Sequence, residues 1–215
     1  MYLKQEKKQK AESIFIMKNI KKSISAGIMI GIGATVYLLC ENKIIAAFLF
    51  AAGLFAICTF EMNLFTGKIA YIFENKNSPN CFVIWIGNLI GCFLTAFPIR
   101  LAIPEITQKA YLLVEYKLHN DLLSTIFLSI FCGVLMYLAV ENYKTNKNEF
   151  AKIVGLFLNV VVFIICGFEH SIANMCYCIF SVNNYNMMIH SLIFILIVSF
   201  ANSVGAILCR NLTKN

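Results

Sequence analysis

The chain has 215 residues and a formal net charge of +7, and 60% of its residues are hydrophobic whereas only 13% are charged. Soluble domains have about 45–50% apolar and about 25% charged residues, so this composition excludes a soluble globular protein. A mean hydropathy of +0.75 also excludes a disordered chain and predicts an all-α membrane protein.

Six apolar runs are long enough to cross a hydrocarbon core, which requires about 20 residues. In chain order they cover residues 23–40, 44–73, 81–102, 122–140, 153–180 and 187–209. We expect residues 1–22 to form a basic segment, 23–209 the six-span domain and 210–215 a short tail. The basic segment either lies on anionic headgroups or is a solvated tail, and the sequence favours neither.

The second and fifth runs, 44–73 and 153–180, are too long to be single straight helices across a core of about 30 Å. Each run contains polar residues, between Glu61 and Lys68 in the second and between Gly167 and Asn174 in the fifth. Backbone that leaves a helix inside a membrane needs protein or a water-filled cavity around its amides. Both runs are therefore predicted to be broken helices whose breaks lie inside the bundle.

Basic residues are divided unequally between the two sides of a six-span map. Four of the 18 fall on one side: Lys43, Arg100, Lys109 and Lys117. The other fourteen fall on the opposite side: Lys4, Lys7, Lys8, Lys10, Lys18, Lys21, Lys22, Lys68, Lys76, Lys144, Lys147, Lys152, Arg210 and Lys214. The positive-inside rule then predicts that both termini are cytoplasmic.

The two halves of the chain look like repeats of three spans each. Phe60-Glu61 opens the first break and Phe168-Glu169 the second, 108 positions later, and Asn88-x-x-Gly91 is matched by Asn202-x-x-Gly205. An odd number of spans makes such repeats inverted, with the paired breaks around a midplane site. Helix N-termini at the breaks carry partial positive charge, which favours an anion.

Three ionisable residues, Glu61, Glu169 and His170, lie at depth in the broken runs. Such residues are functional candidates because their burial is costly. The alternative for each glutamate is that it only accepts backbone amides freed by a break, and for His170 that it only joins neighbouring helices by a hydrogen bond.

Nine cysteines show no disulfide framework, because nearly all of them fall in or at the ends of spans. A metal site built from Cys166, His170, Cys176 and Cys178 is disfavoured because the spacing matches no zinc pattern. We expect no metal, no cofactor and no nucleic-acid partner.

Several of these residues also form recognisable motifs. The stretch Gly167 to Met175, read as GFEHSIANM, resembles the signature of the formate/nitrite transporter family. Leu64-Phe65-Thr66-Gly67 is similar to the second-span loop motif of that family, residues 117–140 to its fourth-span region, and Asn202 to its sixth-span motif. Together the motifs sample all but the N-terminal third of the chain.

The resemblance implies an aquaporin-like bundle of six spans in the cell membrane, assembled as a homopentamer. It implies one pathway per protomer for small monovalent anions of weak acids, such as formate, nitrite or hydrosulfide. By matching position, His170 would be the central histidine, Thr66 its partner, Lys117 the vestibule lysine and Asn202 a polar group near the histidine. The resemblance also places Phe50, Leu54 and Phe163 at a cytoplasmic constriction, and Leu64, Phe65 and Met136 at an outer one.

Physical chemistry is consistent with this set, to which Glu169 is added as a pathway residue. Apolar constrictions resist a bare ion more than a neutral acid, and Lys117 raises the local concentration of anions. The proton comes either from His170 or from water near Lys117. Because free histidine titrates near pH 6.5, flux is expected to change between about pH 5 and 7.5.

Several positions depart from the family pattern, among them Gly133 and Asn63. Gly133 stands where an asparagine that faces the pathway is usual, so one polar contact is expected to be missing or replaced by water. Asn63 replaces a common acidic residue, and Glu61 is expected to restore that acid two positions earlier.

Two other classes of protein were weighed. A pore for neutral solutes of the aquaporin kind is the alternative, but its paired Asn-Pro-Ala motifs are absent from the sequence. An intramembrane enzyme using His170, Glu169 and Cys166 or Cys176 is disfavoured because no spacing specifies a nucleophile and its base. We therefore predict that the protein is not an enzyme.

Overall fold

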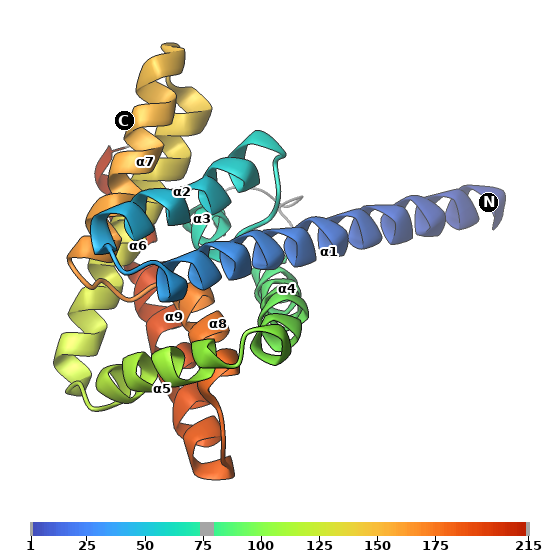
Figure 1. Ribbon diagram of the computed structural model, residues 1–215. Coiled ribbons are helices and arrows are strands. Elements are labelled where there is room, and N and C mark those ends of the chain that lie inside the picture. The colour runs from blue at the N-terminus through green and yellow to red at the C-terminus, as the bar shows by residue number, and fades with distance from the viewer. Residues whose placement is uncertain (1, 74–79, 214–215) are drawn as a thin grey trace.

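A computed structural model of the protein describes residues 2–73 and 80–213, so Lys76 and Lys214 of the charge count lie outside the described residues. The described residues are mostly helical and contain no strand (Figure 1). The elements are α1 (Tyr2–Leu39), α2 (Lys43–Thr59), α3 (Phe65–Lys68), the 3-10 helix η1 (Ile69–Tyr71), α4 (Cys81–Ala102), α5 (Glu105–Leu118), α6 (Leu122–Thr145), α7 (Glu149–Ile165), α8 (Ser171–Ser181) and α9 (Tyr185–Thr213).

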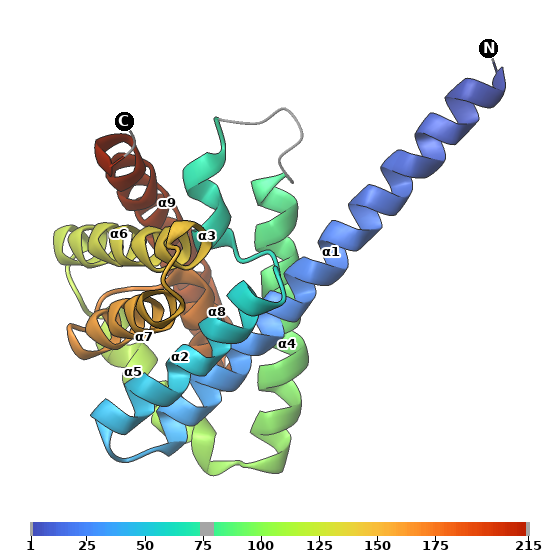
Figure 2. The ribbon, with the colours of Figure 1, turned by 90° about the horizontal axis from the view of Figure 1, so that it is seen from above.

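Helix α1 joins the basic segment to the first apolar run without interruption, because it continues for 38 residues from Tyr2 to Leu39. Lysine, glutamate and glutamine favour helix, and no proline interrupts this part of the chain. Figure 2 shows the N-terminal half of α1 extending away from the bundle. In the same view the start of α1 and the end of α9 both point toward the top of the picture.

Length and composition identify the helices that are able to cross a membrane. Residues 15–39 of α1 and the whole of α4, α6 and α9 are long and apolar enough, and α2 and α8 are shorter apolar helices. Both breaks are present, since α2 ends at Thr59 before α3 begins at Phe65, and α7 ends at Ile165 before α8 begins at Ser171. Helix α5 is not among the predicted elements; it begins directly after Pro104, a residue favoured at helix starts.

The packing of the helices follows the repeat. Helix α1 packs on α4 and α2, α6 packs in the same way on α9 and α7, and α2 meets α7 where the halves join. Glycines allow the close approach: a Cβ at Gly27 would lie 2.2 Å from the carbonyl oxygen of Asn88, and a Cβ at Gly133 would lie 2.1 Å from that of Asn202. Gly133 is thus a helix contact with no room for a side chain, and the expectation that a polar contact of the pathway is lost there stays a prediction.

Candidate functional site

The first break is closed by the side chain of Asn88, which is fully buried. Its Oδ1 accepts the backbone N–H of Phe65 at 2.9 Å. Its Nδ2 donates to the carbonyl oxygens of Ser23 and Asn63, each at 2.8 Å. One amide therefore satisfies three backbone groups that belong to α1, the break and α3.

The second break is closed in the same way by Asn202. Its Oδ1 accepts the N–H of Ser171 at 2.9 Å, and its Nδ2 donates to the carbonyl oxygens of Ser129 and Glu169, each at 2.8 Å. The side chain is fully buried, and its oxygen and both amide hydrogens are occupied by backbone. Asn202 lies close to His170, as expected, but its visible task is to hold the break.

Backbone geometry gives the register of the repeat. Glu61 and Gly167 are the described residues with positive φ, 51° and 68°, and they lie 106 positions apart. At the same offset, the N–H of Asn63 donates to the carbonyl of Lys22, and that of Glu169 to Leu128. Asn63 is thus the counterpart of Glu169, and the pairing of Glu61 with Glu169 at 108 positions is wrong by two residues.

Glu61 is not at depth. Its side chain is 84% exposed and lies 3.5 Å from Lys22, so it neither accepts the amides of the break nor takes the place of a buried acid. The prediction that Glu61 lies at depth is wrong, because the chain turns at Glu61, which has a positive φ, and leaves its side chain exposed.

His170 is the last residue of the second break, directly before α8, and is 2% exposed. Its Nε2 is 2.9 Å from the hydroxyl of Thr66, so the expected contact between these residues is present. Its Nδ1 accepts the N–H of Ala173 at 3.1 Å and caps α8. Its ring stacks on Phe163, with centroids 5.7 Å apart.

This geometry specifies one form of the imidazole. Because a backbone N–H donates to Nδ1, that nitrogen carries no hydrogen, and the ring proton sits on Nε2, where it donates to Thr66. A charged ring would lose the bond to Ala173 and place a cation at the positive end of α8. The arrangement favours a neutral His170 that presents a donor.

Lys117 reaches the same region from α5. Its Nζ lies 2.6 Å from Oε2 of Glu169, and the two side chains are only 11% and 2% exposed. Asn174 donates to the same carboxylate at 2.8 Å. Both residues are among the predicted pathway residues, but their ion pair, which joins positions 52 residues apart, is not predicted from the sequence. A signal for this ion pair in the sequence is the opposite charge of the two residues in a chain with few charges at depth.

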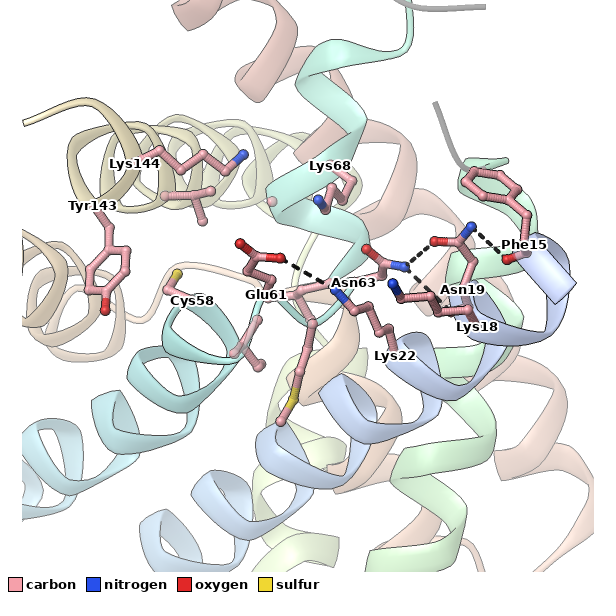
Figure 3. Close-up of a pocket in the computed structure, with 15 residues that line it drawn as sticks. Phe15, Lys18, Asn19, Lys22, Cys58, Glu61, Asn63, Lys68, Tyr143 and Lys144 are labelled. Carbon is pink, nitrogen blue, oxygen red and sulfur yellow. Dashed lines mark hydrogen bonds and ion pairs between the residues drawn. The ribbon is translucent and has the colours of Figure 1, made fainter. Parts of the chain in front are cut away.

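All six residues expected at constrictions are buried: Phe50, Leu54, Leu64, Phe65, Met136 and Phe163. Leu64 lines a cavity of about 640 Å³ together with Lys18 and Lys22, which we name the basic cavity (Figure 3). Phe163 instead lines a cavity of about 40 Å³ with Lys117 and His170. The sides assigned to Leu64 and Phe163 are therefore exchanged.

Chain direction explains this exchange. Helix α2 leads toward the basic side, so Leu64, which follows α2, lies nearer that side than Phe50 does. Helix α7 runs the opposite way and brings Phe163, near its end, toward Lys117. The positions of Leu64 and Phe163 along two oppositely directed spans would have predicted these sides from the sequence.

Comparisons with known proteins agree with one another. The family described as formate/nitrite transporter matches residues 2–214. The uncharacterized transporter YwcJ of Bacillus subtilis is 31% identical over 193 residues, 78% of this chain and 75% of that protein. The formate channel FocA of Escherichia coli K12 is 23% identical over 74% of this chain and 64% of its own length, so the chain spans less than two thirds of that relative.

Among solved structures, a pentameric formate channel with formate bound superposes with a TM-score of 0.73. The superposition covers 92% of this chain and 93% of that one, at 24% sequence identity. At this identity the likeness shows a shared fold.

Proposed function

Since the chain is a multi-pass membrane protein of the formate/nitrite transporter family, we propose that it is a transmembrane channel or transporter for small monovalent anions of weak acids, such as formate, nitrite or hydrosulfide. The observation that carries the proposal is the buried Thr66–His170 pair, which lies between the basic cavity and the Lys117 side. Fold and relatives support the class of substrate.

The proposal includes six spans, with the broken second and fifth counted as one each, in an aquaporin-like arrangement. It orients the basic cavity and both termini toward the cytoplasm, in agreement with the positive-inside rule. It also includes a homopentamer in the cell membrane, by analogy with the solved pentameric channel. Native mass spectrometry of the purified protein tests the pentamer.

Passage is proposed to occur as the neutral acid. Lys117 attracts the anion on its side, although its partner Glu169 cancels much of the charge. The anion takes a proton from water near Lys117, and the hydroxide stays in solution on that side. The neutral acid then passes Phe163 and exchanges hydrogen bonds with the donors of His170 and Thr66. Beyond Leu64 it reaches the basic cavity and loses the proton there. A neutral solute avoids the Born cost of an ion at the apolar walls.

In this mechanism His170 supplies a hydrogen-bond donor and does not titrate. We therefore replace the expectation of a histidine-dependent pH profile: flux should rise as pH falls toward the pKa of the permeant acid. A His170→Gln variant, which keeps an N–H donor, should conduct more slowly with a profile of the same shape. A step near pH 6.5 that disappears in this variant would contradict the neutral ring.

The direct test is flux into proteoliposomes with formate, nitrite and hydrosulfide compared in one preparation. His170→Ala and Lys117→Ala should each lower the flux by about tenfold, which corresponds to the loss of about one hydrogen bond. Lys109→Ala is the matched control, because Lys109 is exposed on the same helix α5. Permeability to water or glycerol without anion flux would overturn the proposal in favour of a neutral-solute pore.

A further inference from the structure

The basic cavity contains an unusual set of side chains. Four lysines line it, contributed by α1, α3 and α6, together with one acid, Glu61 (Figure 3): Lys18, Lys22, Lys68 and Lys144. Apolar groups form much of the remaining wall: Phe15, Ile57, Met62, Leu64 and Val140. The cavity thus combines a positive rim with an apolar surface.

Among the described residues, the four lysines of this cavity have fewer acids beside them: Glu61 lines the cavity, and Glu141 lies near Lys144 through its bond with Tyr71. Glu61 lies 3.5 Å from Lys22, and this is the cavity's ion pair among the described residues. Lys18 and Lys68 have no carboxylate within 4.0 Å in the described part of the chain, and Lys144 lies over the ring of Tyr71, 4.4 Å from its centroid. Like charges held at one site repel one another and attract anions.

The repeat shows where the balancing charge has been replaced. On the Lys117 side a buried carboxylate, Glu169, is held by Lys117 and Asn174. At the offset of 106 positions, Asn63 stands in place of Glu169 and Lys68 in place of Asn174. Asn63 is buried and bonded to Asn19, so it supplies polarity without charge. The same architecture is neutralised from within on one side and positive on the other.

We propose that the basic cavity binds an organic phosphate, a ligand with two or more negative charges on an apolar body, and that the bound ligand slows passage of small anions. A monovalent acid anion would neutralise only one of the excess positive charges and fill little of a cavity of about 640 Å³. Cavities of about 300–1,000 Å³ suit ligands much larger than formate. The phosphate comes either from a soluble metabolite or from the headgroup of an anionic lipid.

The position of the cavity explains the effect on passage. Leu64 lines the cavity and is followed two residues later by Thr66, the partner of His170. A ligand held by Lys68 and Lys144 would lie over this entrance and compete with small anions for the same positive field. This part of the inference rests on the proposed function, whereas the binding itself does not.

Binding is measured first, by isothermal titration of ATP in the presence of EDTA into full-length protein in phosphatidylcholine nanodiscs. The expected result is saturable binding that weakens about tenfold or more in Lys68→Gln/Lys144→Gln, since charge-assisted hydrogen bonds are lost. The matched control is Lys21→Gln/Lys147→Gln, which removes two exposed lysines outside the cavity and should change the affinity by about twofold or less.

Formate flux is then measured with ATP, and separately in liposomes that contain phosphatidic acid. Inhibition by ATP that is lost in the cavity double variant identifies a soluble ligand. Inhibition by phosphatidic acid alone, lost in the same variant, identifies a lipid headgroup. If the double variant does not fold, Lys144→Gln serves in its place, because Lys144 is exposed.

Three results overturn the inference: neither ATP nor phosphatidic acid has an effect, the two double variants lose binding equally, or the cavity variant responds as the wild type does. Normal formate flux without ATP or phosphatidic acid effects leaves the proposed function intact and removes only this inference. ATP binding that depends on the cavity lysines, without any anion flux, leaves the binding part of the inference intact. It removes the proposed function and, with it, the effect on passage.

Discussion

The two breaks are built on the same backbone and differ in the charge that surrounds them. Asn88 and Asn202 each join three backbone groups with nearly the same distances. Around the second break, the opposite charges of Lys117 and Glu169 neutralise each other in a buried ion pair. Around the first, lysines face an open cavity with one exposed acid. The backbone groups of both breaks are hydrogen-bonded in the same way, whereas the charged side chains around the two breaks differ.

Substitution of the contact glycines should have the largest effect and should affect both halves equally. Gly27→Ala and Gly133→Ala each place a Cβ about 2 Å from a backbone oxygen, which cannot move aside as a side chain can. Each should lower the free energy of unfolding by about 3 kcal/mol or more, the upper end for overpacking. Thermal unfolding in detergent measures this, and loss at one position alone would show that the halves are not packed alike.

Removal of the asparagine side chain that closes either break should cause the next largest loss of stability. Asn88→Ala and Asn202→Ala each leave buried backbone groups without a partner, at a cost of about 2–3 kcal/mol. The control is Asn159→Ala, since Asn159 is half-buried and donates one bond to the carbonyl of Gly155 in its own helix. Unfolding midpoints equal to that of the control would contradict this role of the two asparagines.

The two ion pairs should respond differently. Lys117→Ala leaves Glu169 buried without its cation and should destabilise the protein by about 2 kcal/mol more than Lys22→Ala, which exposes Glu61 only slightly further. Exposed pairs contribute about 0–1 kcal/mol. Chemical unfolding of both variants at low and high salt measures the difference, and equal losses would show that Glu169 is not desolvated.

The smallest effects should come from the two residues with positive φ. Gly167→Ala should cost about 1 kcal/mol through backbone strain alone, because no atom lies within 4 Å of its added Cβ. Glu61→Gly should relieve similar strain and raise the free energy of unfolding by up to about 1 kcal/mol. The loss of the weak ion pair with Lys22 reduces this gain slightly. Opposite shifts in the unfolding midpoint confirm the shared turn, and shifts of the same sign contradict it.

Chain-local patterns predicted much of this molecule. Span-length apolar runs indicated a membrane protein. Polar interruptions at residues 61–68 and 167–174 predicted the two breaks, which the structure contains. The motifs that begin at Asn88 and Asn202 indicated the repeat. The family was recognisable from contiguous motifs around Thr66 and His170 and is confirmed. The roles of the pathway residues remain predictions, although the contact between Thr66 and His170 is present.

Other features depended on the tertiary structure, because they join residues distant in the sequence or depend on the turn of the chain. The ion pair of Lys117 with Glu169 exists because α5 folds back over α8. The exposure of Glu61 follows from a turn that composition does not reveal. Hydrophobicity and short motifs determine which segments enter the membrane, since burial of apolar surface depends on each segment's own composition. Which charges meet depends on helix packing, because packing brings Lys117 to Glu169 and places Asn63 and Lys68 at the matching positions of the first break.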